Sequence, residues 1–253
     1  MGPGAAVARR RTTPRAVPGR DPGRCRMIGP MADSRSPSLS LISRIRRPAV
    51  GTGRPPILFL FHGVGSNELS MAGLAPDLDP RLLVVSVRSP IELGPFSFGW
   101  YPVEFAWDGP RIDAEEARAG WERAASFVDE AVTSLGADPG RVFAAGFSQG
   151  GIVSLALLLT SPERVAGAVC MSGRLPAEVL PHAAPPARLR GKPVLIVHGT
   201  GDRTLPVEYA RSARDVLSDL PVELTYREFD IGHTTSPESV AFVSGWIGER
   251  LAP

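Results

Sequence analysis

Cysteine and histidine are scarce in this chain of 253 residues, which has two of the former and four of the latter. None of them shows the spacing of a zinc site or of an H-E-x-x-H helix, and no glycine loop of the phosphate-binding type is present. We therefore expect neither a metal nor another cofactor. Cys25 and Cys170 lie in unrelated contexts and have no evident reason to pair, which fits a reducing compartment.

Long apolar runs are also missing. No window approaches the roughly 18 consecutive apolar residues of a transmembrane helix, so no membrane span is predicted. The N-terminal region lacks the apolar stretch of about 7 to 15 residues that a signal peptide needs. We interpret the protein as cytoplasmic.

The first 30 residues differ in composition from the remainder. They contain seven Arg and one Asp, a net charge of +6, which leaves −4 for the rest of the chain. Arg, Pro and Gly fill 17 of these 30 positions, a composition that predicts disorder. Residues 31–253 are expected to form a single catalytic domain. A mis-assigned start, with translation beginning at Met27 or Met31, is the alternative origin of the segment. No aromatic interleaving accompanies its arginines, so no nucleic acid partner is expected.

Apolar strand-like runs alternate with helical patterns along residues 31–253. This order indicates an α/β fold with a mainly parallel central sheet and helices on both faces. Asp113 is a predicted helix start, Gly136 its end, and Ser236 the N-cap of a last helix. Strands are expected at residues 39–47, 57–61, 82–87, 193–199 and 222–229, and further helices at 149–160, 206–220 and 237–251.

The most informative motif is G-x-S-x-G at residues 146–150, where a strand-like run meets an apolar helix. Such a nucleophile elbow projects its serine, here Ser148, from a tight turn that only glycines allow. A serine hydroxyl needs an imidazole as general base, and the imidazole needs a carboxylate. We assign these roles to His233 and Asp202, each of which follows a predicted strand. Asp230 is the weaker rival for the acid, since it lies only three residues before His233.

Two backbone amides are predicted to form an oxyanion hole. One belongs to Gln149, directly after the serine and at the start of a helix. The other is assigned to Val64, in the glycine-containing turn after residues 57–61. The long aromatic stretch at residues 88–110 is predicted to wall an acyl pocket, with Phe98 and Trp100 as lining residues.

These motifs together resemble the phospholipase/carboxylesterase family of α/β-hydrolases, which includes small bacterial carboxylesterases and acyl-protein thioesterases. The resemblance runs from about residue 40 to the C-terminus and rests on the order Ser148, Asp202, His233. It implies hydrolysis of short- to medium-chain esters through an acyl-enzyme, without a cofactor. Thioester or lysophospholipid cleavage, and a catalytically weak ligand-binding role, are the alternatives. The expected partner is a small acyl ester or thioester, and a homodimer stays open.

Overall fold

The computed structural model describes residues 39–106 and 109–251. The predictions for residues 1–30 lie outside these ranges and stay predictions. Seven strands form the main sheet: β1 (Ser43–Arg46), β2 (Ile57–Phe61), β3 (Leu83–Val87), β8 (Val142–Phe147), β9 (Gly167–Met171), β10 (Pro193–Gly199) and β11 (Glu223–Phe229). The α-helices are α1 (Glu68–Ala72), α2 (Ala114–Leu135), α3 (Gln149–Thr160), α4 (Pro186–Leu189), α5 (Glu208–Ser218) and α6 (Pro237–Glu249), with short 3-10 turns at Ala75–Asp77 and Ala177–His182.

The main sheet has the order β1-β3-β2-β8-β9-β10-β11. β1 is antiparallel to β3, and every other neighbouring pair is parallel. This confirms the mainly parallel sheet that the sequence predicts. Because parallel strands end at one edge, the loops after β2, β8, β10 and β11 gather there, which is where ligands bind in open α/β sheets.

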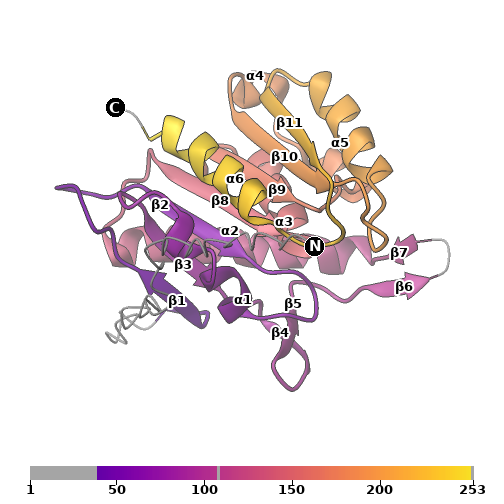
Figure 1. Ribbon diagram of the computed structural model, residues 1–253, viewed down its shortest axis with the longest axis horizontal. Coiled ribbons are helices and arrows are strands. Elements are labelled where there is room, and N and C mark those ends of the chain that lie inside the picture. Colours follow the sequence, from indigo (N-terminus) through magenta and orange to yellow (C-terminus); the bar gives the residue numbers. More distant parts are fainter. Residues whose placement is uncertain (1–38, 107–108, 252–253) are drawn as a thin grey trace, which may run out of the picture. The chain divides into compact units, whose positions relative to one another are not determined.

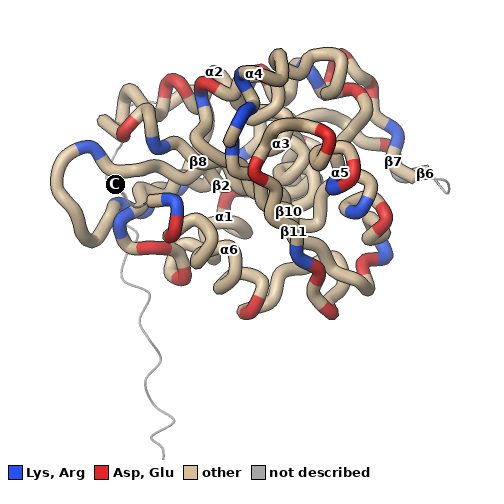
Figure 2. Tube along the Cα trace, turned by 90° about the horizontal axis from the view of Figure 1, so that it is seen from above, with Lys and Arg blue, Asp and Glu red and all other residues tan. Residues whose placement is uncertain are grey.

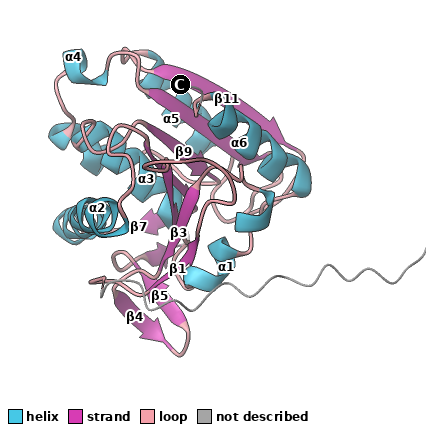
Figure 3. Cartoon of the chain, turned by 90° about the vertical axis from the view of Figure 1, so that its left-hand side faces the viewer, coloured by secondary structure: helices cyan, strands magenta, loops and turns pink. Residues whose placement is uncertain are grey.

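Each central strand divides its side chains between two cores. In β2, for example, Phe59 and Phe61 belong to the core that includes residues of α2, α3 and α5, whereas Leu58 and Leu60 belong to the core that includes residues of α1 and α6. Figures 1 and 3 show helices on both faces of the sheet. Burial on both faces explains why these strands are near-continuous apolar runs in the sequence.

Most predicted helix ends match the structure. The Asp113 side chain accepts a hydrogen bond from the Glu116 N–H, and Gly136 ends α2 with a left-handed φ of 68°. Ser236 caps α6 in a capping box with Ser239. No helix in the described ranges is long and apolar enough to cross a membrane. Charged positions lie mainly on the helices and loops (Figure 2).

No strand or helix was expected at residues 88–110. Their described part forms two antiparallel pairs, β4 (Ile91–Gly94) with β5 (Ser97–Gly99), and β6 (Glu104–Ala106) with β7 (Gly109–Arg111). Strands of three or four residues are too short to show an alternating pattern. Neither β9 nor α1 was predicted from the sequence.

Candidate active site

The turn between β8 and α3 forces Ser148 into a conformation that non-glycine residues rarely adopt. Its φ is 53°, and its backbone N–H donates to the carbonyl of Met171 on β9. A Cβ at Gly146 would lie 2.2 Å from the Gly150 carbonyl, and one at Gly150 would lie 2.0 Å from the Phe61 oxygen. Both glycines are therefore required by close backbone contact. Strain of this kind concentrates at functional sites.

The loops after β8, β10 and β11 bring Ser148, Asp202 and His233 together. His233 Nε2 lies 3.1 Å from Ser148 Oγ, and His233 Nδ1 lies 2.6 Å from Asp202 Oδ2. The imidazole thus bridges the hydroxyl and the carboxylate. The ring of Phe147 packs against the His233 ring at a centroid distance of 4.8 Å. This arrangement can move a proton from the hydroxyl to the imidazole.

Asp202 is buried and its second oxygen is also occupied. Oδ1 accepts hydrogen bonds from the backbone N–H groups of Thr204 and Leu205, at 2.9 and 2.8 Å. His198 lies behind it: Nε2 is 2.8 Å from the Leu205 carbonyl oxygen and 3.4 Å from Asp202 Oδ2. His198 precedes the glycine that ends β10, and no sequence motif singled it out. Its spacing of four from Asp202 was the available signal.

The turn after β2 carries Val64 next to Ser148. A Cβ at Gly63 would lie 3.2 Å from the Ser148 Cβ, so the turn packs directly on the serine. No hydrogen bond within the described ranges uses the N–H of Val64 or of Gln149. Both amides are therefore free to donate to an oxygen held beside Ser148.

The buried imidazole of His62 fixes the direction of the Val64 amide. Its Nε2 accepts from the Ser89 N–H at 3.0 Å, so the proton sits on Nδ1 and is donated to the Gly63 oxygen at 2.7 Å. A trans peptide unit carries its C=O and N–H on opposite sides. Anchoring the Gly63 carbonyl therefore points the Val64 N–H the other way. Burial lowers the pKa of His62, which keeps the ring neutral in this role.

Backbone groups of the β4–β5 region hold both predicted oxyanion donors. The Phe98 carbonyl accepts from the Gly65 N–H, and the Phe98 N–H donates to the Ser66 oxygen, each at 2.9 Å. The Gln149 side chain accepts a hydrogen bond from the backbone N–H of Trp100 and donates one to the backbone carbonyl oxygen of Tyr101, each at 2.8 Å. This region of the sequence therefore supports the site through its main chain.

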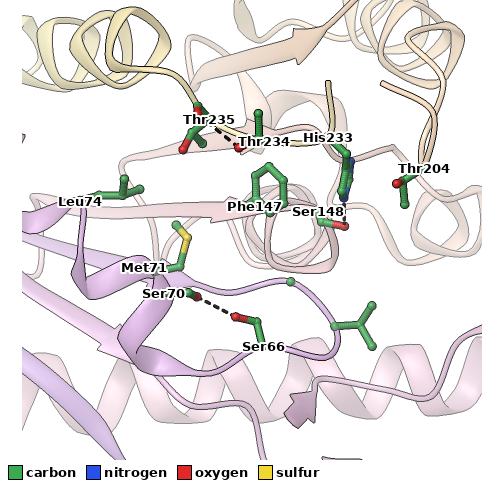
Figure 4. A pocket seen from close by; sticks show the side chains of 12 residues that line it. Ser66, Ser70, Met71, Leu74, Phe147, Ser148, Thr204, His233, Thr234 and Thr235 are labelled. Carbon is green, nitrogen blue, oxygen red and sulfur yellow. Dashed lines mark hydrogen bonds between the residues drawn. The ribbon is translucent and has the colours of Figure 1, made fainter. Parts of the chain in front are cut away.

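Two cavities meet at Ser148 in the described part of the chain. We call the first the His233 cavity: it measures about 390 Å³ and combines hydroxyl groups with apolar side chains (Figure 4). The second, the Arg174 cavity, measures only about 20 Å³. Besides Gly63, Val64, Ser148 and His233, the first is lined by Ser66, Ser70, Thr204, Thr234, Thr235, Met71, Leu74 and Phe147. The second is lined by Val64, Tyr101, Val103, Pro110, Ile112, Ser148, Gln149, Ile152, Arg174 and Leu205.

The predicted lining roles of Phe98 and Trp100 need correction, because neither residue lines either of these cavities. Trp100 is fully buried, with its ring edge-on to Phe61 at 5.2 Å. The Phe98 ring stacks under the guanidinium of Arg88 at 4.6 Å. Both residues contact the residues around Ser148 through their backbone groups. Trp107, in the same predicted wall, lies outside the described residues.

A metal site was not expected from the sequence. Among the described residues, no group of three or more His, Cys, Asp or Glu side chains could hold a metal ion. The expectation that the protein works without a cofactor stays a prediction.

Comparison with known proteins gives a consistent result. A family model described as Phospholipase/Carboxylesterase matches residues 51–250. Carboxylesterase SOBER1 of Arabidopsis thaliana is 28% identical over 56% of this chain, and the match spans 63% of that protein, just under two thirds. Acyl-protein thioesterase 1 of Yarrowia lipolytica is 25% identical over 82% of this chain and 96% of its own length.

Solved structures share the architecture. The crystal structure of the Bacillus cereus carboxylesterase superposes with a TM-score of 0.72 at 24% identity, covering 83% of this chain and 94% of that one. At this identity the likeness establishes the fold, which is that of the α/β-hydrolases.

Proposed function

Because the chain belongs to the phospholipase/carboxylesterase family of hydrolases, we propose that it is a serine esterase whose nucleophile is Ser148. The observation that carries the proposal is the continuous contact from Ser148 Oγ through His233 to Asp202, at 3.1 and 2.6 Å. Family membership alone supports ester hydrolysis. The contact supports a particular set of residues for it.

The reaction follows from this geometry. Ser148 Oγ attacks the ester carbonyl carbon while His233 Nε2 takes the hydroxyl proton. Asp202 stabilises the imidazolium that forms and holds its Nδ1–H. The Val64 and Gln149 amides donate to the oxyanion of the tetrahedral intermediate. His233 then gives its proton to the departing alcohol, which leaves an acyl-enzyme on Ser148. A water molecule, activated by the same imidazole, releases the acid and restores the hydroxyl.

The substrates we propose are small carboxylic esters with short- to medium-chain acyl groups. The modest size of the His233 cavity and its mixture of hydroxyl and apolar groups support a small alcohol as the leaving group. Thioesters are the nearest alternative, because a relative is named acyl-protein thioesterase. The cytoplasmic location and the homodimer stay predictions.

The test is hydrolysis of p-nitrophenyl esters from acetate to palmitate by the full chain and by Ser148→Ala. We expect turnover by the first and a loss of about 10⁴- to 10⁶-fold in kcat in the second. Ser154→Ala is the matched control, because that buried serine only bonds the Gly150 carbonyl within α3. EDTA should leave the rate unchanged. Equal rates for Ser148→Ala and the wild type would refute the proposal.

A further inference from the structure

The two cavities at Ser148 serve different halves of an ester. The departing alcohol must take its proton from His233 Nε2, so it has to lie on the side that this ring lines. His233 lines the larger cavity and is absent from the lining of the smaller one. The smaller, Arg174 cavity shares Ser148 and Val64 with the larger one and adds the second oxyanion donor, Gln149. It is therefore the side on which the acyl group lies.

Arg174 reaches this acyl side through a strained turn after β9. Ser172, the residue after the strand, has a φ of 47°, which is rare for a residue with a side chain. Gly173 then passes so close to the nucleophile that a Cβ there would lie 3.0 Å from the Ser148 carbonyl oxygen. The turn is thus pressed against the elbow, and Arg174 follows it directly.

The positive charge of Arg174 has no partner among the described residues. The side chain is half-buried and makes no hydrogen bond or ion pair within the part of the chain that the structure describes. The other cavity walls are mainly aliphatic, with Val103, Ile112 and Ile152 among them. An uncharged acyl chain would gain nothing from a guanidinium in such a wall, whereas a carboxylate would gain charge-assisted hydrogen bonds.

Tyr101 supplies a second, independent observation. It lines the same cavity and is almost fully buried, and its hydroxyl has no hydrogen-bond partner among the described residues. Burial raises the pKa of this phenol, with opposing influences from Arg174 and Glu178, so the group stays protonated and can donate. Buried polar groups in native proteins nearly always have a partner. A ligand oxygen is the partner that this position would accept.

Glu178 is the acidic group near this cluster. It also influences the Tyr101 phenol, and its Oε2 is buried without a partner among the described residues. It forms no ion pair with Arg174 in those ranges. Its carboxylate opposes the binding of an anion, so its removal is expected to strengthen such binding.

We propose that Arg174 and the Tyr101 hydroxyl form a carboxylate-binding acyl subsite, which selects monoesters of short dicarboxylic acids over uncharged esters of equal length. The inference rests on the proposed function, because it assigns the acyl side from the roles of Ser148 and His233. The cavity is small, at about 20 Å³, which favours a short acyl group over a long one.

The test compares monoethyl succinate with ethyl levulinate, in which a methyl ketone replaces the carboxylate at nearly the same size. Ethanol release at about pH 8 gives kcat/KM for each ester. We expect the full-length wild type to prefer the charged ester by about ten- to hundredfold, as for hydrogen bonds to a charged group. Arg174→Met should abolish the preference, measured as the ratio of kcat/KM for the two esters.

Further variants separate charge from structure. Arg174→Lys should retain part of the preference, Tyr101→Phe should reduce it, and Glu178→Gln should increase it. Arg190→Met removes one exposed positive charge elsewhere and should leave the preference intact. An equal or reversed preference in the wild type, or an unchanged one in Arg174→Met, would overturn the subsite.

Binding to Ser148→Ala, measured by calorimetry with the same two esters, distinguishes this inference from the proposed function. If monoethyl succinate binds more tightly than ethyl levulinate, and Arg174→Met removes the difference, the subsite is supported. This holds even if the wild type hydrolyses neither ester, a result that would refute the proposed function. Ser148-dependent hydrolysis of ethyl levulinate without any charge preference in turnover or binding overturns the subsite and leaves the proposed function standing.

Discussion

The two flanks of Ser148 are built in different ways. On one flank, the His233 side chain contacts Ser148 Oγ with one ring nitrogen and the Asp202 carboxylate with the other. On the other, Val64 and Gln149 offer backbone amides, which are oriented by His62 and by the main chain of residues 98–101. The first flank depends on residue type at three positions. The second depends on the orientation of two peptide planes. Many residue types could occupy these positions as long as His62 and the main chain of residues 98–101 keep the planes oriented.

The largest effect is expected on the side-chain flank. Asp202→Asn keeps the size of the side chain but favours the wrong imidazole tautomer, so kcat for p-nitrophenyl acetate should fall by about 10⁴-fold. Asp230→Asn is the matched control, because Asp230 is exposed and lies only three residues before His233. It should retain full activity. A loss of less than tenfold in Asp202→Asn, or a larger loss in Asp230→Asn, would contradict the assignment.

A smaller loss is expected when one backbone donor is removed. Val64→Pro deletes the N–H and should lower kcat by about 10²- to 10³-fold, with little change in KM. Val64→Ala keeps the N–H and should stay near wild-type kcat. Circular dichroism and thermal unfolding would establish that both variants fold. If the two lost activity equally, the side chain of Val64 and not its amide would be responsible.

A substitution that weakens the positioning of the Val64 amide should lower kcat by less than removal of the amide does. His62→Phe removes the bond to the Gly63 carbonyl and leaves the buried Ser89 N–H unpaired, which costs about 1 to 3 kcal/mol of stability. We expect a loss of about tenfold in kcat, because the Val64 N–H keeps its place in the chain but not its fixed direction.

The contribution of His62 to stability should depend on pH. Burial lowers its pKa in the folded state below the usual 6.5, so the unfolded state binds the proton more readily. The contribution is present above pH 6.5 and is lost as the pH falls toward the folded pKa. The free energies of unfolding of the wild type and of His62→Phe, measured in urea from pH 7.5 to 5, should converge as the pH falls. A constant difference would indicate that His62 does not titrate on unfolding.

The smallest effect is expected at the Gln149 side chain. Gln149→Glu can keep the bond from the Trp100 N–H, but it places a carboxylate opposite the Tyr101 carbonyl in a buried site. We expect a several-fold loss of kcat and a lower melting temperature, since the Gln149 amide itself is retained. A loss as large as that of Asp202→Asn would mean that the two flanks do not differ as described.

The same contrast explains what the sequence could predict. Ser148, Asp202 and His233 were identified because each follows an apolar strand and only certain residue types can do the chemistry. Their placement in one constellation agrees with that prediction, although their catalytic roles remain proposals. Helix boundaries at Asp113, Gly136 and Ser236 were predictable because caps are local.

The supports of the oxyanion flank were not predictable in the same way. The sequence drew attention to the rings of Phe98 and Trp100, whereas the structure uses their main-chain groups. Which way a side chain points in β5 depends on the register of a hairpin only a few residues long, and no sequence pattern sets it. Arg174 was missed for a related reason: its position follows from the strained turn at Ser172.

Labelling of the full chain with a fluorophosphonate, followed by peptide mass spectrometry, tests directly whether Ser148 is the nucleophile and His233 its base. Such a reagent traps a nucleophilic serine only when its general base is in place. We expect one adduct, on Ser148, which is absent in Ser148→Ala and forms at least about 10³-fold more slowly in His233→Ala. An adduct on another residue, or equal labelling rates for His233→Ala and the wild type, would contradict this assignment.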